Sequence, residues 1–129
     1  MTIVAIIGLV ILLGLTVFQI LLITGKPLGD FAWGGQHKVL PRNLRIASVS
    51  SIVLYVVFAI FLASKVGIIN IVPSSQLLDT MMWIFAVYFI LGIPLNAISR
   101  NKKERNLMTP VVIALAIIFL VVSLASFGP

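Results

Sequence analysis

The sequence predicts an all-α membrane protein, an antiparallel four-helix transmembrane bundle. Hydrophobic residues make up 61% of its 129 residues and charged residues only 9%, against about 45–50% and about 25% in soluble domains. Charges and turn-forming residues divide the chain into four uncharged apolar stretches of about 20 residues, and each stretch can cross a hydrocarbon core of about 30 Å as a helix. We therefore exclude a water-soluble fold and expect a single domain over residues 1–129.

The first transmembrane helix is expected over residues 2–24, and Gly25, Lys26 and Pro27 end it. No basic segment precedes this apolar run, which is also longer than the apolar part of a usual signal peptide. We therefore interpret it as a retained helix.

The second and third helices are expected over residues 46–64 and 80–99, each between flanking charges. Asn43 is suited to cap the start of the second helix. Pro94 removes one backbone donor within the third helix and predicts a bend without a break.

The fourth helix is expected over residues 107–127, with Thr109 as its N-cap and Pro110 in its first turn. The half that follows Pro110 is entirely apolar. We therefore expect this helix to face mainly lipid, and a larger side chain at Ala116 to be tolerated.

The basic residues predict the orientation of the four helices. Connections 25–44 and 100–106 must lie on the same side of the membrane, and together they hold eight of the nine Lys and Arg residues. The positive-inside rule then places both connections in the cytoplasm and both termini outside the cell. The eight residues are Lys26, Lys38, Arg42, Arg45, Arg100, Lys102, Lys103 and Arg105.

The net charge of +6 is explained by this topology, so we expect no nucleic-acid partner. The same basic connections favour contact with anionic lipid head groups, at roughly 1 kcal/mol for each Lys or Arg near the surface. The absence of cysteine excludes disulfides and thiolate metal sites. No cofactor is expected.

The first connection, 25–44, is long and mixes apolar, aromatic and polar residues. Trp33 is expected at the depth of the membrane interface, and Gly34 and Gly35 permit a turn with positive φ. The connection is either a simple interfacial link or a lid over the cytoplasmic mouth of the bundle. Asp30 and His37 are too few for a metal site or a complete acid–base mechanism. We expect Asp30 to pair with Lys26 or Arg42 and His37 to be solvated.

Small and polar residues form a stripe along each of the two middle helices. Such stripes allow helices to approach closely and to form hydrogen bonds across the contact, so they predict either a packing seam or a transport path. We expect Gly92 and Asn96 to face Ser51 and Tyr55, with Gln19 close by at the cytoplasmic mouth. The stripes comprise Ser48, Ser51, Tyr55, Ala59 and Ala63 in the second helix, and Tyr88, Gly92, Asn96 and Ser99 in the third.

Two segments carry a resemblance to a known group of proteins. Residues 32–37, Ala-Trp-Gly-Gly-Gln-His, and residues 96–105, Asn-Ala-Ile-Ser-Arg-Asn-Lys-Lys-Glu-Arg, resemble segments of small uncharacterised four-span membrane proteins of Gram-positive bacteria. The resemblance implies a location in the bacterial plasma membrane. It implies no activity.

Three functional hypotheses remain. The first is a non-enzymatic structural or interaction partner in the membrane, which forms a homo-oligomer or binds another membrane protein. The second is a small oligomeric channel or carrier for a neutral or anionic solute, with its path along the polar stripes. The third is an enzyme that acts on lipid head groups through Asp30 and His37. A candidate polar cluster or ligand mouth combines Gln19, Asp30, Trp33, His37, Ser51, Tyr55, Tyr88 and Asn96.

Overall fold

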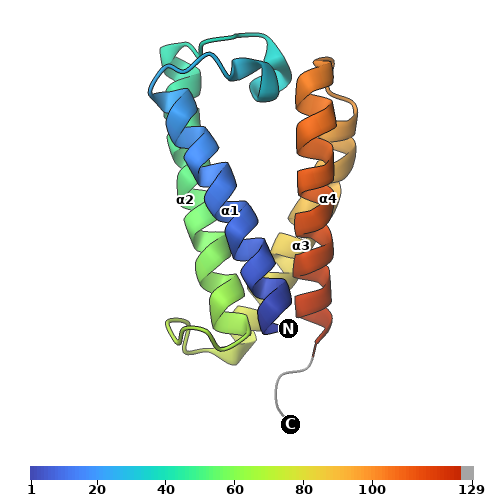
Figure 1. The fold of residues 1–129 in the computed structure, drawn as a ribbon. Helices are drawn as coiled ribbons and strands as arrows, with labels where there is room; N and C mark the ends of the chain where they lie inside the picture. Colours follow the sequence, from blue (N-terminus) through green and yellow to red (C-terminus); the bar gives the residue numbers. More distant parts are fainter. Residues whose placement is uncertain (126–129) are drawn as a thin grey trace.

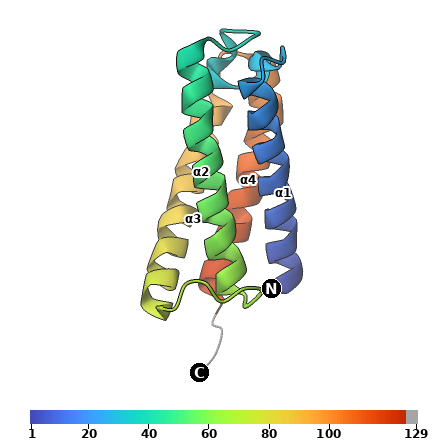
Figure 2. The same ribbon diagram turned by 90° about the vertical axis from the view of Figure 1, so that its left-hand side faces the viewer.

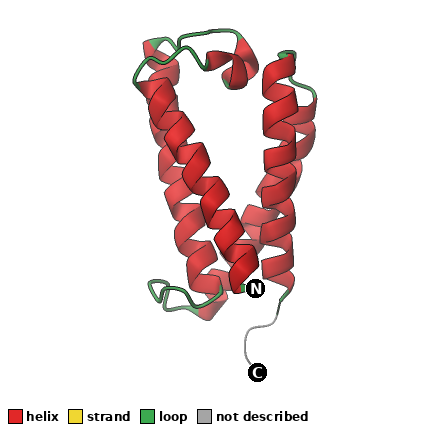
Figure 3. Cartoon of the chain, viewed as in Figure 1, coloured by secondary structure: helices red, strands yellow, loops and turns green. Residues whose placement is uncertain are grey.

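The computed structural model describes residues 1–125 and confirms the expected fold class. Within these residues the chain forms four long helices that alternate in direction, each long and apolar enough to cross a membrane (Figure 1). Two short 3₁₀ helices interrupt the first connection, and no strand is present in the described part (Figure 3). The elements are α1 (Thr2–Ile23), η1 (Gly29–Phe31), η2 (Trp33–Gly35), α2 (Arg42–Lys65), α3 (Ser75–Ala97) and α4 (Lys102–Leu124).

The bundle consists of two helical hairpins, α1 with α2 and α3 with α4. The hairpins meet at the end where α1 begins and α4 ends, called here the narrow end. They separate towards the end that holds connections 24–41 and 98–101, called here the wide end (Figure 1). In the view turned by 90°, α2 lies in front, between α3 and α1, and α4 lies behind it (Figure 2).

An aromatic cluster joins the hairpins. Phe58 of α2 lies edge-on to Phe85 and Phe89 of α3, with ring centroids 4.8 and 4.9 Å apart, and Phe89 lies 5.0 Å from Phe119 of α4. Such arrangements bring the positive ring edge towards the negative ring face, which adds about 0.5–1.5 kcal/mol per pair to the burial of the rings. The cluster therefore fixes how the two hairpins meet.

Close approach of α1 completes the narrow end. A Cβ atom at Gly8 would lie 2.9 Å from Leu62 Cδ2 of α2 and 3.0 Å from Ile118 Cγ2 of α4, so only glycine fits without a shift. Across the 66–74 connection, Lys65 forms an ion pair with Asp79. The narrow end is thus packed by side chains of all four helices.

α2, α3 and α4 begin four or five residues earlier than the expected stretches, so two of the expected caps are wrong. Pro41 and not Asn43 occupies the N-cap position of α2, where no side chain forms a capping hydrogen bond. Asn101 caps α4 in place of Thr109, because Asn101 Oδ1 accepts hydrogen bonds from the backbone N–H groups of residues 103 and 104, at 2.8 and 3.4 Å. Pro110 consequently lies inside α4. Charges mark where the hydrocarbon core ends, whereas a helix can continue into the polar interface until a cap ends it.

The sequence also predicted that Pro94 does not break the third helix and that the fourth helix ends at residue 127. α3 continues past Pro94, since the Ile98 N–H donates to the Pro94 carbonyl at 3.0 Å, and the helix is not broken. The expected end of the fourth helix at residue 127 lies outside the described residues.

The expectation that the fourth helix faces mainly lipid is wrong. α4 packs along α3 and also reaches α1, and Ala116 on it is only 3% exposed. An apolar side chain is equally suited to lipid and to the interior of a membrane bundle, so composition does not reveal which face is buried.

Candidate functional site

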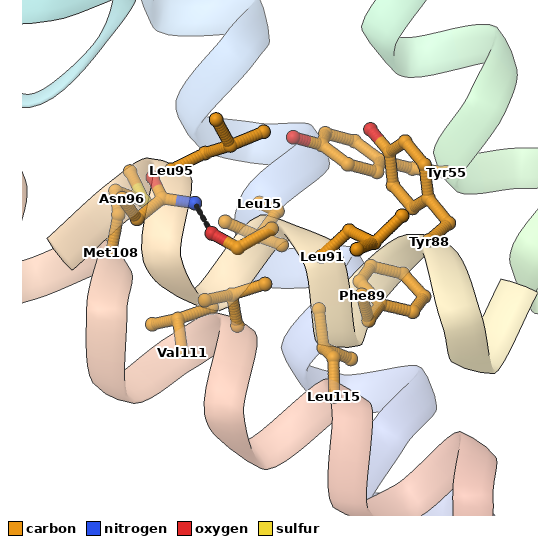
Figure 4. Close-up of a pocket in the computed structure, with 12 residues that line it drawn as sticks. Leu15, Tyr55, Tyr88, Phe89, Leu91, Leu95, Asn96, Met108, Val111 and Leu115 are labelled. Carbon is orange, nitrogen blue, oxygen red and sulfur yellow. Dashed lines mark hydrogen bonds between the residues drawn. The ribbon is translucent and has the colours of Figure 1, made fainter. Parts of the chain in front are cut away.

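A cavity of about 400 Å³ lies between the two hairpins, on the wide-end side of the aromatic cluster. All four helices contribute to its wall, as Figure 4 shows. The lining residues are mostly apolar, and none of them is Asp, Glu, Lys, Arg or His. They are Leu15 of α1, Tyr55 of α2, Tyr88, Phe89, Leu91, Gly92, Leu95 and Asn96 of α3, and Met108, Val111, Val112 and Leu115 of α4.

Three of the expected site residues give the cavity its polar groups. The hydroxyl groups of Tyr55 and Tyr88 lie near each other, and Asn96 lies at the other side of the cavity (Figure 4). Asn96 Nδ2 donates to the Gly92 carbonyl of its own helix at 2.8 Å. The cavity therefore combines an apolar wall with a few fixed polar groups, as small-molecule sites do.

Gln19 lies one helical turn beyond Leu15 on α1 and is only 6% exposed. Its side chain is close enough to the Tyr55 hydroxyl to interact with it. Among the described residues, Gln19 Oε1 has no hydrogen-bond partner. A buried acceptor left unpaired costs about 1–3 kcal/mol. Gln19 is not among the residues that line the cavity, so this carbonyl is enclosed by protein beside it.

The expected contact of Gly92 with Ser51 and Tyr55 is wrong. A Cβ atom at Gly92 would lie 3.1 Å from Val112 Cγ2, so Gly92 faces α4 and not Ser51 and Tyr55 of α2. The connection between α3 and α4 is short and holds them side by side. Ser51 is half-buried and is not among the residues that line the cavity.

The first connection is held to both hairpins. Trp33 Nε1 donates to Ser48 Oγ of α2 at 3.0 Å, and Ser48 is fully buried. On the other side, Asn101 Nδ2 donates to the Gly35 carbonyl at 3.2 Å. These two hydrogen bonds and the ion pair between Asp30 and Lys103 are called here the clasp.

Asp30 pairs with Lys103 of α4, with Oδ2 and Nζ 3.3 Å apart, and not with Lys26 or Arg42 as expected. The reason is that η1 lies against the start of α4, which is far along the sequence but adjacent in the fold. His37 is exposed. Among residues 1–125, no group of three His, Asp or Glu side chains is placed to hold a metal ion.

The connection also has a small core of its own. Leu22, Ala32 and Leu40 are buried together, and the Gly29 N–H donates to the Lys38 carbonyl at 2.8 Å. Gly34 and Gly35 have positive φ, as expected, at 77° and 68°. The first connection is thus a packed structure that crosses the wide end from one hairpin to the other (Figure 1).

One polar residue of this region was not identified from the sequence. Glu104 lies one helical turn before Met108 on α4, and within the described structure its buried Oε2 has no hydrogen-bond partner. Sequence reasoning assigned it to a polar connection, because the apolar stretch begins later. The signal that could have placed it in α4 is Asn101 three residues earlier, a favourable N-cap before an acidic first turn.

Comparison with known proteins gives no family: no protein-family model, no curated protein and no solved structure matches this chain.

Proposed function

We propose that this chain is a non-enzymatic binding protein of the bacterial plasma membrane, and that the cavity between its hairpins holds a small apolar or amphiphilic molecule. In this role it acts as an interaction partner within the membrane. The cavity is the single observation that carries the proposal. Its volume of about 400 Å³ falls in the range of about 300–1,000 Å³ typical of ligand sites, and an engineered apolar cavity of about 150 Å³ already binds benzene.

Binding fits the geometry better than conduction through a single chain. The aromatic rings of Phe58, Phe89 and Phe119 pack together beyond the cavity towards the narrow end. At the wide end, the first connection crosses from one hairpin to the other. A channel or carrier for a neutral or anionic solute would need both barriers to open, and no described contact favours such a path.

The proposed orientation places the wide end in the cytoplasm and both termini outside. It is supported by the basic side chains, since Lys38, Arg42, Arg100 and Lys102 are all exposed at this end of the bundle. Anionic lipid head groups at the cytoplasmic surface are their proposed partners.

Photolabelling in liposomes tests the binding function. A photoreactive decane analogue should label peptides from α3 and α4 that line the cavity. Leu91→Trp should reduce this labelling several-fold, because Leu91 lines the cavity yet is 60% exposed, so a larger ring there can fill the cavity without disturbing the core. Leu13→Trp is the matched control, since Leu13 is 64% exposed on α1 and does not line the cavity. Equal labelling of both variants and the parent chain would contradict the proposed site.

A further inference from the structure

We infer, building on the proposed binding function, that the ligand is an uncharged molecule that carries a carbonyl group on an apolar chain. The carbonyl oxygen accepts hydrogen bonds from the hydroxyl groups of Tyr55 and Tyr88, and the chain lies against the apolar part of the cavity wall. Tyr55 belongs to α2 and Tyr88 to α3, so the bound carbonyl joins the two hairpins.

The position of the two hydroxyl groups is the first observation. The Tyr88 ring lies 5.5 Å from the ring of Phe58 and 5.3 Å, edge-on, from the ring of Phe89, measured between centroids. Tyr88 is thus placed at the border between the aromatic cluster and the cavity. The Tyr55 hydroxyl lies near that of Tyr88, and both residues line the cavity (Figure 4). Two O–H groups therefore stand together in one part of the wall.

The number of protons in this pair indicates what it lacks. Each tyrosine hydroxyl carries one proton and can also accept. If one hydroxyl donates to the other, one proton is left over, whichever of them donates. Gln19 Oε1, the acceptor beside Tyr55, has no hydrogen-bond partner among the described residues, so it does not take this proton. Asn96 lies at the other side of the cavity. The pair therefore needs an acceptor from a bound molecule.

A carbonyl group meets this need better than a hydroxyl group. A carbonyl oxygen has two lone pairs and brings no proton, so it can accept from Tyr55 and Tyr88 at the same time. A hydroxyl ligand would bring a third proton and leave a surplus again. Tyrosine O–H groups serve as donors to carbonyl oxygens in enzyme sites for the same reason.

The absence of charge on the ligand follows from the rest of the wall. None of the residues that line the cavity is Asp, Glu, Lys, Arg or His. A charged group placed there without a partner would be strongly disfavoured. A ketone or an ester on an alkyl chain has the required acceptor without a charge.

The test compares analogues of decane, 2-decanone and 1-decanol, each with a photoreactive group at the far end of the chain, in liposomes that contain the full protein. The decanone analogue should label the cavity about 3- to 10-fold more efficiently than the decane analogue, which is the gain expected from one buried hydrogen bond. It should also label more efficiently than the decanol analogue. The carbonyl stretching frequency of bound, isotopically labelled decanone should fall, because hydrogen bonding weakens the C=O bond.

Conservative variants assign the effect to the two hydroxyl groups. Tyr55→Phe and Tyr88→Phe should each reduce the preference for decanone and leave decane labelling unchanged, which also shows that the variants are folded. Thr80→Val is the matched control, because it removes a hydroxyl group from an exposed position of α3 that does not line the cavity. This variant should behave like the parent chain.

The outcomes separate this inference from the function on which it rests. If no analogue labels the cavity, the binding function itself is contradicted. If decane and decanone label equally and neither tyrosine variant changes this, the cavity binds apolar molecules but the assignment of the two hydroxyl groups is wrong. If decanol labels better than decanone, the tyrosine pair accepts a hydrogen bond and the carbonyl ligand is overturned.

Discussion

Gln19 is buried, and its Oε1 has no hydrogen-bond partner among the described residues. Replacing Gln19 with leucine removes an unpaired buried carbonyl, so the protein should become more stable by about 1 kcal/mol. Thermal unfolding in mild detergent measures the change in stability. A loss of more than about 1 kcal/mol would mean that Gln19 Oε1 has a partner in the protein.

Gly92 and Gly14 form a matched pair for testing the contact between α3 and α4. Gly92→Leu should destabilise the bundle by about 1–3 kcal/mol, because even a Cβ atom there approaches Val112 Cγ2 to 3.1 Å. Gly14→Leu should be tolerated, since nothing lies within 4 Å of an added Cβ atom on that exposed face of α1. Unfolding in detergent checks both variants. Similar stability of the two would show that α3 and α4 do not meet at Gly92.

The burial of Ala116 reverses the expectation that a larger side chain is tolerated at this position. Ala116 is almost fully buried in α4, so Ala116→Leu should also destabilise the bundle, by about 1–3 kcal/mol. The same unfolding measurement with Ile117→Leu as control, at an exposed neighbour, isolates the effect of burial. If Ala116→Leu is as stable as the parent chain, α4 faces lipid at this position, as its composition predicts.

At the scale of elements, Asn101 has two separable tasks. Its Oδ1 caps α4, and its Nδ2 holds the first connection through Gly35. Asn101→Asp keeps the cap and loses only the bond to Gly35, whereas Asn101→Ala loses both. We expect the alanine variant to be less stable by about 1 kcal/mol than the aspartate variant, the usual contribution of an N-cap. Proteolysis of the 25–41 connection should increase in both variants, and no increase would mean that Gly35 is held by other contacts.

The helices were predictable from the sequence to within a few residues, while their ends and faces were not. Four apolar stretches between charges are strong signals, because a backbone in lipid must satisfy its own hydrogen bonds. The ends of α2 and α4 extend into charged residues such as Arg42 and Lys102, which hydropathy excludes. The buried face of α4 could not be predicted, since lipid and protein interior accept the same side chains.

The candidate site was predictable only in part for a related reason. Polar residues in apolar stretches are conspicuous, so Gln19, Tyr55, Tyr88 and Asn96 could be singled out, and all four lie in or beside the cavity. Their partners depend on which helices pair. Because α3 pairs with α4, Gly92 meets Val112, and because η1 lies at the start of α4, Asp30 meets Lys103. The spacing of residues along the chain predicts neither of these two contacts.

At the scale of the whole molecule, the distribution of basic residues predicts the topology. A reporter placed after residue 129 and one within residues 67–78 should lie outside the cell, and a reporter near Lys102 should lie in the cytoplasm. Neutralising Arg100, Lys102, Lys103 and Arg105 should weaken the orientation of the α3–α4 hairpin. Reporters with compartment-specific activity give the readout. A cytoplasmic reporter after residue 129 would contradict the orientation.

The clasp also implies an order of assembly. Trp33 and Ser48 belong to the first hairpin, so their hydrogen bond can form once α1 and α2 are in the membrane. The ion pair of Asp30 and the hydrogen bond of Gly35 form later, because their partners Lys103 and Asn101 are synthesised about 70 residues further along the chain. Between these events the first connection has only one of the three clasp contacts, and the aromatic cluster lacks Phe85, Phe89 and Phe119. A nascent chain stopped after α2 therefore has the first hairpin only, and the second hairpin, α3 with α4, completes the contacts at both ends of the bundle.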